Sequence, residues 1–392
     1  MTVYLDNGAT TRLAPEVREA MLPWLGERWG NPSSSHRLGL DAARAVKQAR
    51  RDLADSLGCA ATEVVLTSGG TEADALAVIG GALGLAGPKK PGHIVVSAIE
   101  HPAVLESAGL LKDVGWDVTE IGVDGQGLVS PDAIAQAMRD DTALVSVMLV
   151  NNELGAVQPI EEIVRAAKAR KSDVLVHTDA VQAFTKLQFD VRDLGVDLLS
   201  VSGHKFHGPT GTGALYVRST VRLRPLLAGG GQEGGRRSGT ENVPGAVGLA
   251  AAARLGCQDL SAKVQEITAR RDRLHARLSD SVDGLTLNGP PSGPRRVCHN
   301  LHISVTGCES ASLLHAMEAK GVYASAGSAC HSKDAKLSHV LQAVGAKARG
   351  EAHLRLTLSR DTTDEDVDKA AAAFVAAIAE LRRRPGGGVH GP

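Results

Sequence analysis

The chain has 392 residues, and its 43 lysines and arginines nearly cancel its 44 aspartates and glutamates, which leaves a net charge of -1. A charge so close to zero gives no electrostatic reason to expect nucleic acid or an anionic membrane as a partner. Hydrophobic residues make up 43% of the chain and charged residues 22%, which is typical of a soluble globular protein long enough for two or three domains.

No leader or membrane span is expected. The N-terminus lacks a basic and then apolar segment, and no stretch approaches the run of about 18 apolar residues that a membrane helix needs. We therefore expect a cytoplasmic protein. The cysteines are odd in number and widely spread: Cys59, Cys257, Cys298, Cys308 and Cys330. This pattern argues against a disulfide framework and leaves at least one free thiol that needs a role.

The first half of the chain alternates between helical patterns and short apolar runs. After an N-terminal arm, a helix is predicted to begin at Pro15, and an amphipathic helix follows over about 38–58. The apolar runs lie at 64–67, 93–97, 143–149, 174–178 and 198–201. Strands that alternate with helices predict an α/β fold, with a large three-layer α/β/α domain around a mostly parallel sheet.

The alternation stops after Tyr216. A glycine-rich segment, 227–235, precedes a helical run that is nearly continuous from Pro244 to about Ser279, which we interpret as a connector. Beyond it, strands near 300–305 and 353–359 and helices near 309–320 and 364–383 indicate a smaller α+β domain. We therefore predict an arm over 1–15 that packs with the small domain, a large domain over 16–256, a small domain over 257–384, and a disordered tail over 385–392.

Polar residues follow several of the predicted strands, where ligands bind in an α/β sheet. Lys205 lies just past the last of these strands with Ser202 and His204 beside it, although a lone lysine is usually a solvated surface charge. The segment 67–72 lies between a strand and a helix. Its two glycines and the helix N-terminus suit a phosphate, but an ordinary capped helix start has the same residues.

Three further candidates follow other strands. His101 suits stacking on a planar ligand or proton transfer, or a purely structural role. The segment 151–153 would equally form a turn, and Asp179 would equally cap a helix. Together they match one ligand, because a phosphorylated pyridine needs a phosphate cradle, a carboxylate opposite the ring nitrogen, a ring stacked on its face and a lysine for covalent attachment.

The chain resembles the cysteine desulfurase group of the class V, fold-type I pyridoxal-phosphate enzymes. The motifs that carry the resemblance are Tyr4–Asn7 with Thr10 and Thr11, Asn31–Ser34, Thr67–Asp74, Glu100 with His101, Asn151–Glu153, His177–Ala183, Ser202–Lys205, Gly229–Glu233, Arg237–Thr240 and Ser325–Cys330. They occur in the same order as in the family and span nearly the whole chain. The resemblance implies the pyridoxal-phosphate-dependent transferase fold, pyridoxal 5'-phosphate as cofactor, and a homodimer.

The resemblance also implies a role for each matched residue. Lys205 would bind the cofactor covalently, Asp179 would pair with the ring nitrogen, and His101 would stack on the ring and transfer protons. Asn152 and Gln182 would hydrogen-bond the substrate or the ring oxygen. The implied cofactor-binding residues are Gly70, Thr71, His101, Asn152, Asp179, Gln182, Ser202, His204, Lys205 and Thr240, of which Thr240 would reach the phosphate held by the partner subunit.

Two residues determine the implied reaction. Arg355 matches the arginine that binds the substrate carboxylate, with Asn152 and Asn31 beside it; an ordinary surface arginine is the alternative. Cys330 matches the nucleophile that takes sulfur from L-cysteine as a persulfide, and the small and polar residues around it favour an exposed loop over a buried, inert thiol. With Lys205 and His101 as the other catalytic residues, the product would be L-alanine, and an acceptor protein would take the sulfur for iron-sulfur cluster or thiocofactor assembly.

Some alternatives stay open. The segment around Cys330 also resembles that of selenocysteine lyases, an aminotransferase of the same fold would need no cysteine there, and a non-catalytic binding protein is possible on this scaffold. Gly8 stands where the family usually has alanine, a change expected to matter little. We expect no metal site at Cys298, His299, His302 and Cys308, because neighbours on a strand point to opposite faces.

Overall fold

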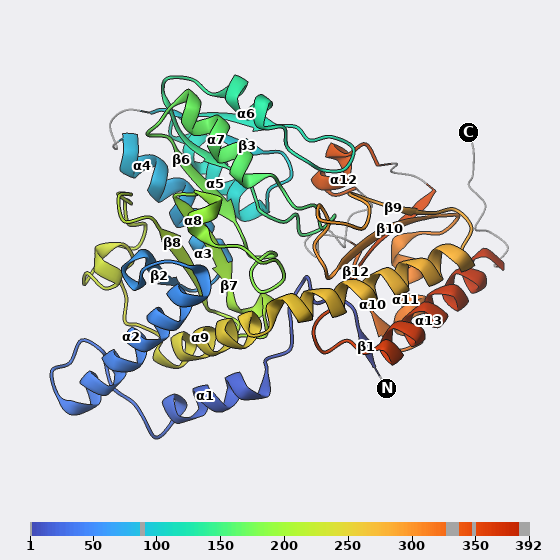
Figure 1. Ribbon diagram of the computed structural model, residues 1–392, viewed down its shortest axis with the longest axis horizontal. Coiled ribbons are helices and arrows are strands. Elements are labelled where there is room, and N and C mark those ends of the chain that lie inside the picture. The colour runs from blue at the N-terminus through green and yellow to red at the C-terminus, as the bar shows by residue number, and fades with distance from the viewer. Residues whose placement is uncertain (1, 87–90, 327–336, 347–349, 384–392) are drawn as a thin grey trace.

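A seven-stranded sheet forms the centre of the larger part of the molecule (Figure 1). The computed structural model describes residues 2–86, 91–326, 337–346 and 350–383. The strands of this sheet are β2 (Val64–Thr67), β3 (His93–Ser97), β4 (Asp117–Ile121), β5 (Thr142–Ser146), β6 (Leu175–Asp179), β7 (Leu198–Ser202) and β8 (Gly213–Val217). Their spatial order is β2-β8-β7-β6-β5-β3-β4, and β8 runs antiparallel to both of its neighbours. The predicted mostly parallel sheet is confirmed.

Helices cover both faces of the sheet, because both faces of its strands are apolar. Val65 and Leu198 face one side, which is covered by α3 (Gly70–Ala75), the π-helical η2 (Leu76–Gly80), α4 (Gly81–Ala86) and α5 (Pro102–Asp113). Val64 and Leu199 face the other side, which is covered by α2 (Arg37–Leu57), α6 (Pro131–Ala137), α7 (Ile160–Arg170), α8 (Val191–Leu194) and α9 (Val243–Cys257). The three-layer arrangement is thus confirmed.

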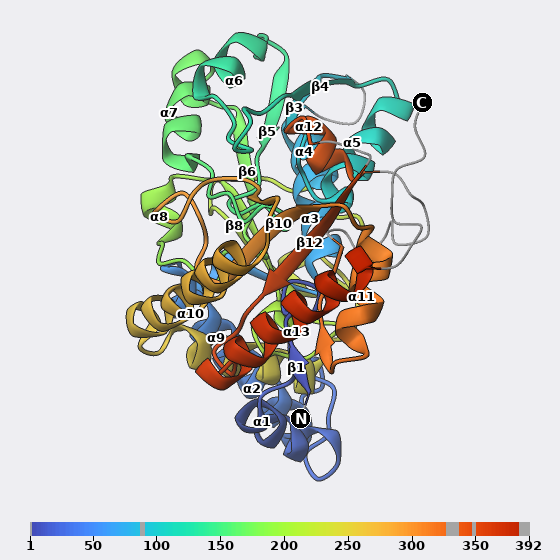
Figure 2. The same cartoon turned by 90° about the vertical axis from the view of Figure 1, so that its right-hand side faces the viewer.

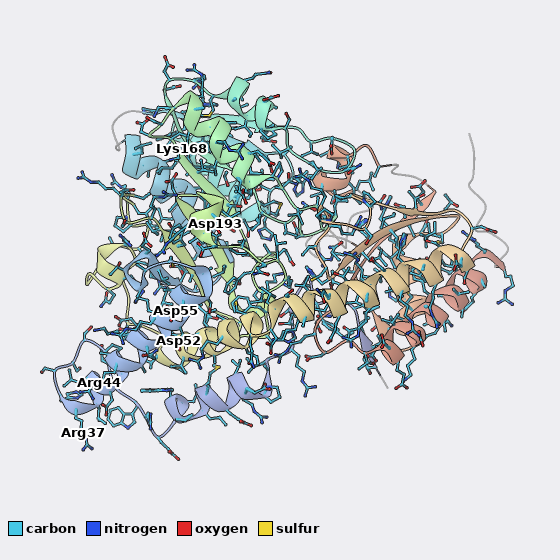
Figure 3. All side chains as sticks on the ribbon, viewed as in Figure 1. Arg37, Arg44, Asp52, Asp55, Lys168 and Asp193 are labelled. Carbon is cyan, nitrogen blue, oxygen red and sulfur yellow. The ribbon has the colours of Figure 1, made fainter. Side chains whose placement is uncertain are left out.

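The helix α2 shows how local sequence sets an element's ends. The ring of His36 caps its first turn by accepting a hydrogen bond from the Gly39 N–H at 3.3 Å. The helix ends at Gly58, whose φ of 77° is in the left-handed region that favours glycine. Asp52, labelled in Figure 3, forms an ion pair with Arg254 and so joins α2 to α9. The helix α1 (Pro15–Leu25) packs against the same α9.

Two helices lead from the large sheet to a second, smaller sheet (Figure 1). The sequence predicted one nearly continuous helix, but the structure breaks it into α9 and α10 (Leu260–Ser281). Asp259 adopts a left-handed φ of 49° at the break. Lys263 satisfies the end of α9 by donating a hydrogen bond to the Leu255 carbonyl at 2.7 Å. Local polar contacts at this junction therefore replace the helix that periodicity predicted.

The smaller unit is built on the antiparallel strands β9 (Leu285–Leu287), β10 (Asn300–Thr306) and β12 (Glu351–Thr357), in the order β12-β10-β9. The helices α10, α11 (Ser310–Glu318) and α13 (Asp364–Arg383) lie beside this sheet (Figure 2). The predicted strands and helices of this region agree with those observed. Within the described residues, no helix has the length and apolar character needed to cross a membrane.

The N-terminal arm joins the two units. Its strand β1 (Val3–Tyr4) pairs in parallel with β11 (Val322–Tyr323), and the Thr357 N–H donates to the Leu5 carbonyl at 2.7 Å. A few residues later, the Thr11 N–H donates to the carbonyl of His204 at 2.8 Å, at the edge of the large sheet. The arm therefore passes from the small unit to the large one across the region between them.

Candidate active site

Four polar clusters lie where β2, β3, β6 and β7 end, and a fifth follows β5. These strands are parallel to one another, so their carboxyl ends lie along one edge of the sheet. Residues after such ends face a shared crevice. The sequence argument that separate motifs meet at one edge is confirmed by the topology.

Lys205 lies in a single 3-10 turn, Gly203–Lys205, directly after β7. A side chain at Gly203 would put its Cβ 2.5 Å from the Thr212 hydroxyl, so this turn requires glycine. The Lys205 ammonium donates to the carbonyls of Gly8 at 2.8 Å and Ala9 at 2.7 Å. On its backbone side, the Lys205 carbonyl accepts from the Lys186 ammonium at 2.9 Å. The lysine is thus held between the arm and the sheet.

Asp179 and His101 form the electrostatic centre of the site. Asp179 is the last residue of β6 and is buried, with one carboxylate oxygen accepting from the Val181 N–H at 2.8 Å. Burial raises the pKa of Asp179, and the nearby His101 and Lys205 oppose that rise. Burial also lowers the pKa of His101, whose Nδ1 accepts from the Ala103 N–H at 3.1 Å. This hydrogen bond assigns the proton of the neutral ring to Nε2.

The N-terminus of α3 packs tightly against Val181, which follows β6, and Ser202, which ends β7. A Cβ at Gly70 would lie 3.0 Å from Val181 Cγ2 and 3.4 Å from Ser202 Cβ, so a larger residue would push the helix away from both neighbours. Thr71 follows in the first turn, whose N–H groups lack partners within the helix. Gly70, Thr71 and Ser202 are therefore brought together, with amides and a hydroxyl suited to an anionic group.

Gln182 and Arg355 both reach the N-terminal arm. Gln182 donates to the Gly8 carbonyl at 2.8 Å, the same carbonyl that Lys205 contacts. Arg355 is 3% exposed and donates to the Asn152 carbonyl and to a carboxylate oxygen of Asp6, each at 3.0 Å. Its Nε is buried without a hydrogen-bond partner among the described residues. A guanidinium with one unused donor beside the site suits a carboxylate ligand.

Other predicted site residues lie at its margin. His204 is held by a contact of its Nδ1 with the Thr10 hydroxyl at 3.2 Å, and burial lowers its pKa to about 4. Thr240 is exposed, and its loop is tied to α3 by the ion pair of Arg237 with Glu72 at 2.7 Å. Asn31 is exposed in the loop between α1 and α2, and its side chain accepts from the nearby Ser33 N–H. The structure thus does not bring Asn31 into contact with the other described candidates.

Cys330 lies outside the described residues, but the chain on both sides of it is fixed at the site. Before it, the Arg355 N–H donates to the Ser325 carbonyl at 2.7 Å. After it, the Ser338 hydroxyl donates to Glu153 at 2.6 Å, and His339 contacts the Glu100 carbonyl at 2.9 Å. The described residues on either side of this segment therefore contact β12 of the small sheet and the segments that follow β3 and β5 of the large one.

Sequence reasoning did not assign roles to Asp6 and Glu100. Glu100 is buried, and one of its oxygens accepts from the Ser97 hydroxyl at 2.5 Å and from the Met148 N–H at 2.7 Å. It thereby ties the end of β3 to the segment that leads into Asn152. Both residues occur in the motifs quoted above, but a motif does not reveal which partner a carboxylate contacts.

The residues present fit pyridoxal phosphate. The narrow packing at Gly70 leaves backbone amides for a phosphate, Asp179 is a buried carboxylate for a ring nitrogen, and Lys205 provides the amine. His101, at the start of α5, provides an aromatic face. Carboxylate, amine and anion cradle are the groups that this cofactor requires.

Comparison with known proteins identifies the family. The family model described as aminotransferase class-V matches residues 3–370. This chain belongs to that family. The cysteine desulfurase IscS of Methanosarcina thermophila is 45% identical over 381 residues, which cover 97% of this chain and 93% of that protein. The family resemblance and the dependence on pyridoxal phosphate are therefore confirmed.

Solved structures agree with this result. A NifS-like protein superposes with a TM-score of 0.90 at 35% identity, covering 97% of this chain and all of that one (100%). A structure of SspA in complex with cysteine gives a TM-score of 0.79 at 36% identity over 92% of this chain and 100% of its own. The predicted fold, a pyridoxal-phosphate-dependent transferase fold with a smaller second unit, is confirmed.

We predict that Glu100→Gln flattens the pH dependence of stability. Burial raises the pKa of Glu100 from 4.5 to about 8, so its stabilising contribution is complete below the unfolded pKa and is lost as pH rises through about 8. Between about pH 6 and about pH 9, the wild type should lose roughly 2–3 kcal/mol relative to the variant in urea denaturation. Glu106→Gln, on the exposed side of α5, is the control, and a parallel decline in wild type and Glu100→Gln would contradict the assignment.

Proposed function

We propose that this protein is a cysteine desulfurase that converts L-cysteine to L-alanine and passes the sulfur to an acceptor protein. The observation that carries the proposal is the placement of Arg355 beside the Lys205 site, since a carboxylate-binding guanidinium next to a cofactor-binding amine suits an α-amino acid substrate. Similarity to proteins named cysteine desulfurase, and to a structure containing cysteine, supports this substrate.

The site residues divide the chemistry between them. Arg355 binds the substrate carboxylate with its unused Nε–H and with an N–H that it does not donate to Asp6 or Asn152. Lys205 would hold the cofactor through its side-chain nitrogen, and its amine would act as the base that removes the α-proton of the substrate. Bound pyridoxal phosphate supplies an electron sink for the pair left on the α-carbon. Asp179 holds a proton on the ring nitrogen, which favours that sink.

Cys330 completes the reaction as a thiolate. Its sulfur attacks the sulfur of the substrate, so that an S–S bond forms and the substrate's C–S bond breaks with its electron pair on the departing three-carbon fragment. His101, which has its proton on Nε2, returns a proton to that fragment, which leaves as alanine. The two ends of the segment that bears Cys330 lie at the site, through Ser325 and Ser338.

The other cysteines do not suit a nucleophile. Cys59, Cys257, Cys298 and Cys308 are free thiols in the part of the chain that the structure describes. Burial raises the pKa of each of them, to about 12 for Cys59 and to about 11 for Cys298. A raised pKa keeps a thiol protonated and therefore unreactive at neutral pH.

We also propose a homodimer in the cytoplasm, in which Thr240 contributes to the site of the partner subunit. Large apolar side chains are exposed on and after α1, namely Leu22 (54%), Leu25 (64%), Trp29 (67%) and Leu40 (46%). Several large exposed apolar side chains in one stretch of chain are typical of an interaction site. The exposed Thr240 loop, anchored by Arg237, is consistent with a contribution across such an interface.

Cys330→Ser should reduce alanine formation from cysteine at least about 10³-fold, because serine is not a comparable sulfur nucleophile. The measurement is alanine release by the cofactor-loaded enzyme, together with persulfide labelling of the protein. Cys308→Ser is the matched control and should retain activity within about 2-fold. Full alanine formation by Cys330→Ser would instead favour an aminotransferase-like reaction, and relative rates on cysteine and selenocysteine would separate a desulfurase from a selenocysteine lyase.

Arg355→Lys should raise the KM for cysteine by roughly 10- to 100-fold, since lysine keeps the charge but loses the planar pair of donors. Cofactor content, measured by absorbance, should stay unchanged because Arg355 contacts the arm and Asn152 rather than the phosphate cradle. Arg139→Lys, at an exposed ion pair with Asp117, is the control. An unchanged KM in Arg355→Lys would show that another group binds the carboxylate.

Leu25→Asp should raise the dimer dissociation constant at least about 10-fold, because it places a charge in the proposed apolar interface. Sedimentation velocity over a range of protein concentrations measures this change. Leu110→Asp is the matched control, since Leu110 is exposed to a similar extent (58%) but lies on α5. If both variants sediment as the wild type does, the α1 surface is not the dimer interface.

A further inference from the structure

A cavity of about 40 Å³ lies on the backbone side of Lys205, away from the cofactor site. The arm, the segment after β7, α10 and the segment after β12 all contribute to its lining. Of the residues implied to hold the cofactor, Lys205 is the one that also lines this cavity. The cavity is therefore a separate site that shares a wall with the active site.

The lining of the cavity carries basic side chains. It contains the side chains of Lys186, Lys205, Lys263 and Arg360 together with two histidines, and no aspartate or glutamate of the described residues lines it. The carboxylate of Asp361 lies 3.6 Å from His207 and 3.5 Å from Arg360, and its side chain is 59% exposed. The negative charge available is thus at the rim, where water screens it.

The ammonium group of Lys186 lies in the interior without a carboxylate partner among the described residues. Its ammonium is buried and donates to the Lys205 carbonyl, and no described carboxylate lies within ion-pair distance of it. Burial and the charge of Lys205 lower the pKa of Lys186 to about 7. A buried ammonium is stable in its charged form when an anion lies beside it.

His299 provides a second, independent observation. Its side chain is buried, with the residue 1% exposed, and it lines the cavity. Neither ring nitrogen has a hydrogen-bond partner among the residues that the structure describes. Because buried polar groups are nearly always hydrogen-bonded, a ring of this kind indicates a partner located within the cavity.

The volume of the cavity limits the size of that partner. A single water molecule needs about 10–15 Å³ of such space, so about 40 Å³ admits one monatomic anion or two to three waters. We propose that the cavity binds a small monovalent anion of the size of chloride, between the Lys186 ammonium and the N–H of His299. The anion neutralises Lys186 and thereby supports the carbonyl contact that positions the backbone of Lys205. This site does not depend on which reaction the enzyme catalyses.

Thermal unfolding tests the proposal with sodium chloride as the probe. The Tm of both the cofactor-free and the cofactor-loaded protein should rise by on the order of 1–2 °C between chloride-free buffer and about 100 mM chloride, at an ionic strength kept constant with sodium gluconate. Lys186→Met and His299→Phe should each abolish the chloride-dependent rise. Lys112→Met, a lysine on α5 far from the cavity lining, is the control and should retain it.

His299→Phe keeps a buried ring of similar shape, so its melting curves in chloride and gluconate test the proposal even if Lys186→Met fails to fold. Crystals grown with sodium bromide in place of chloride should show an anomalous peak within hydrogen-bond distance of Lys186 Nζ. Melting curves that coincide in chloride and gluconate, or bromide crystals with water alone at this position, would overturn the proposal.

Discussion

The carbonyl of Gly8 is the contact on which the arrangement of the active site depends. It accepts hydrogen bonds from Lys205 and from Gln182, each at 2.8 Å. The same arm binds the small unit, where the Gly8 N–H donates to the Thr357 hydroxyl at 2.7 Å and Asp6 pairs with Arg355. One short extended segment thus sets the position of Lys205 relative to Arg355. Lys205 follows a strand of the large sheet and Arg355 lies on a strand of the small one, so neither sheet alone could fix the distance between them.

The absence of a side chain at Gly8 contributes to this arrangement. A Cβ there would lie 3.1 Å from Thr357 Cγ2 and 3.4 Å from the guanidinium carbon of Arg355. The distance to Thr357 is shorter than an ordinary van der Waals contact, whereas the distance to Arg355 is at the lower end of the ordinary range. With alanine at this position, Thr357 or the arm has to move by a few tenths of an ångström. Gly8 thus lets the arm approach Thr357 of β12 more closely than an alanine would permit.

Much of the fold was predictable from the sequence. The strands β2, β3, β7 and β10 are short runs of buried residues, and their hydrophobic character alone indicated where they lie. The boundary between α9 and α10 was not predictable, because it depends on the left-handed Asp259 and on a hydrogen bond donated by Lys263. Such contacts form only once the chain has folded. The hydrophobic periodicity of the sequence reports burial and therefore does not predict these contacts.

The site residues were likewise predictable, whereas the contacts between distant parts of the chain were not. The sequence identified Lys205, Asp179 and His101, because residue type and position after a strand are enough to suggest a cofactor. It did not predict that Arg355 binds Asp6, since their pairing joins residues separated by almost the whole chain. It also gave no sign of the basic cavity behind Lys205, whose lining comes from the arm, β7, α10 and β12 regions together. Long-range pairs of this kind depend on tertiary packing, which no local motif encodes.

Burial separates reactive from inert groups throughout this structure. Cys59 and Cys298 are buried, which raises their pKa values and keeps their thiols protonated, whereas the described residues on either side of the Cys330 segment, Ser325 and Ser338, make polar contacts at the site. A thiol must meet a substrate and then a second protein, so it cannot remain in a packed core. Lys205 has the opposite requirement, because its amine has to stay at one fixed point. The fold meets this need by holding the lysine from the arm and from Lys186.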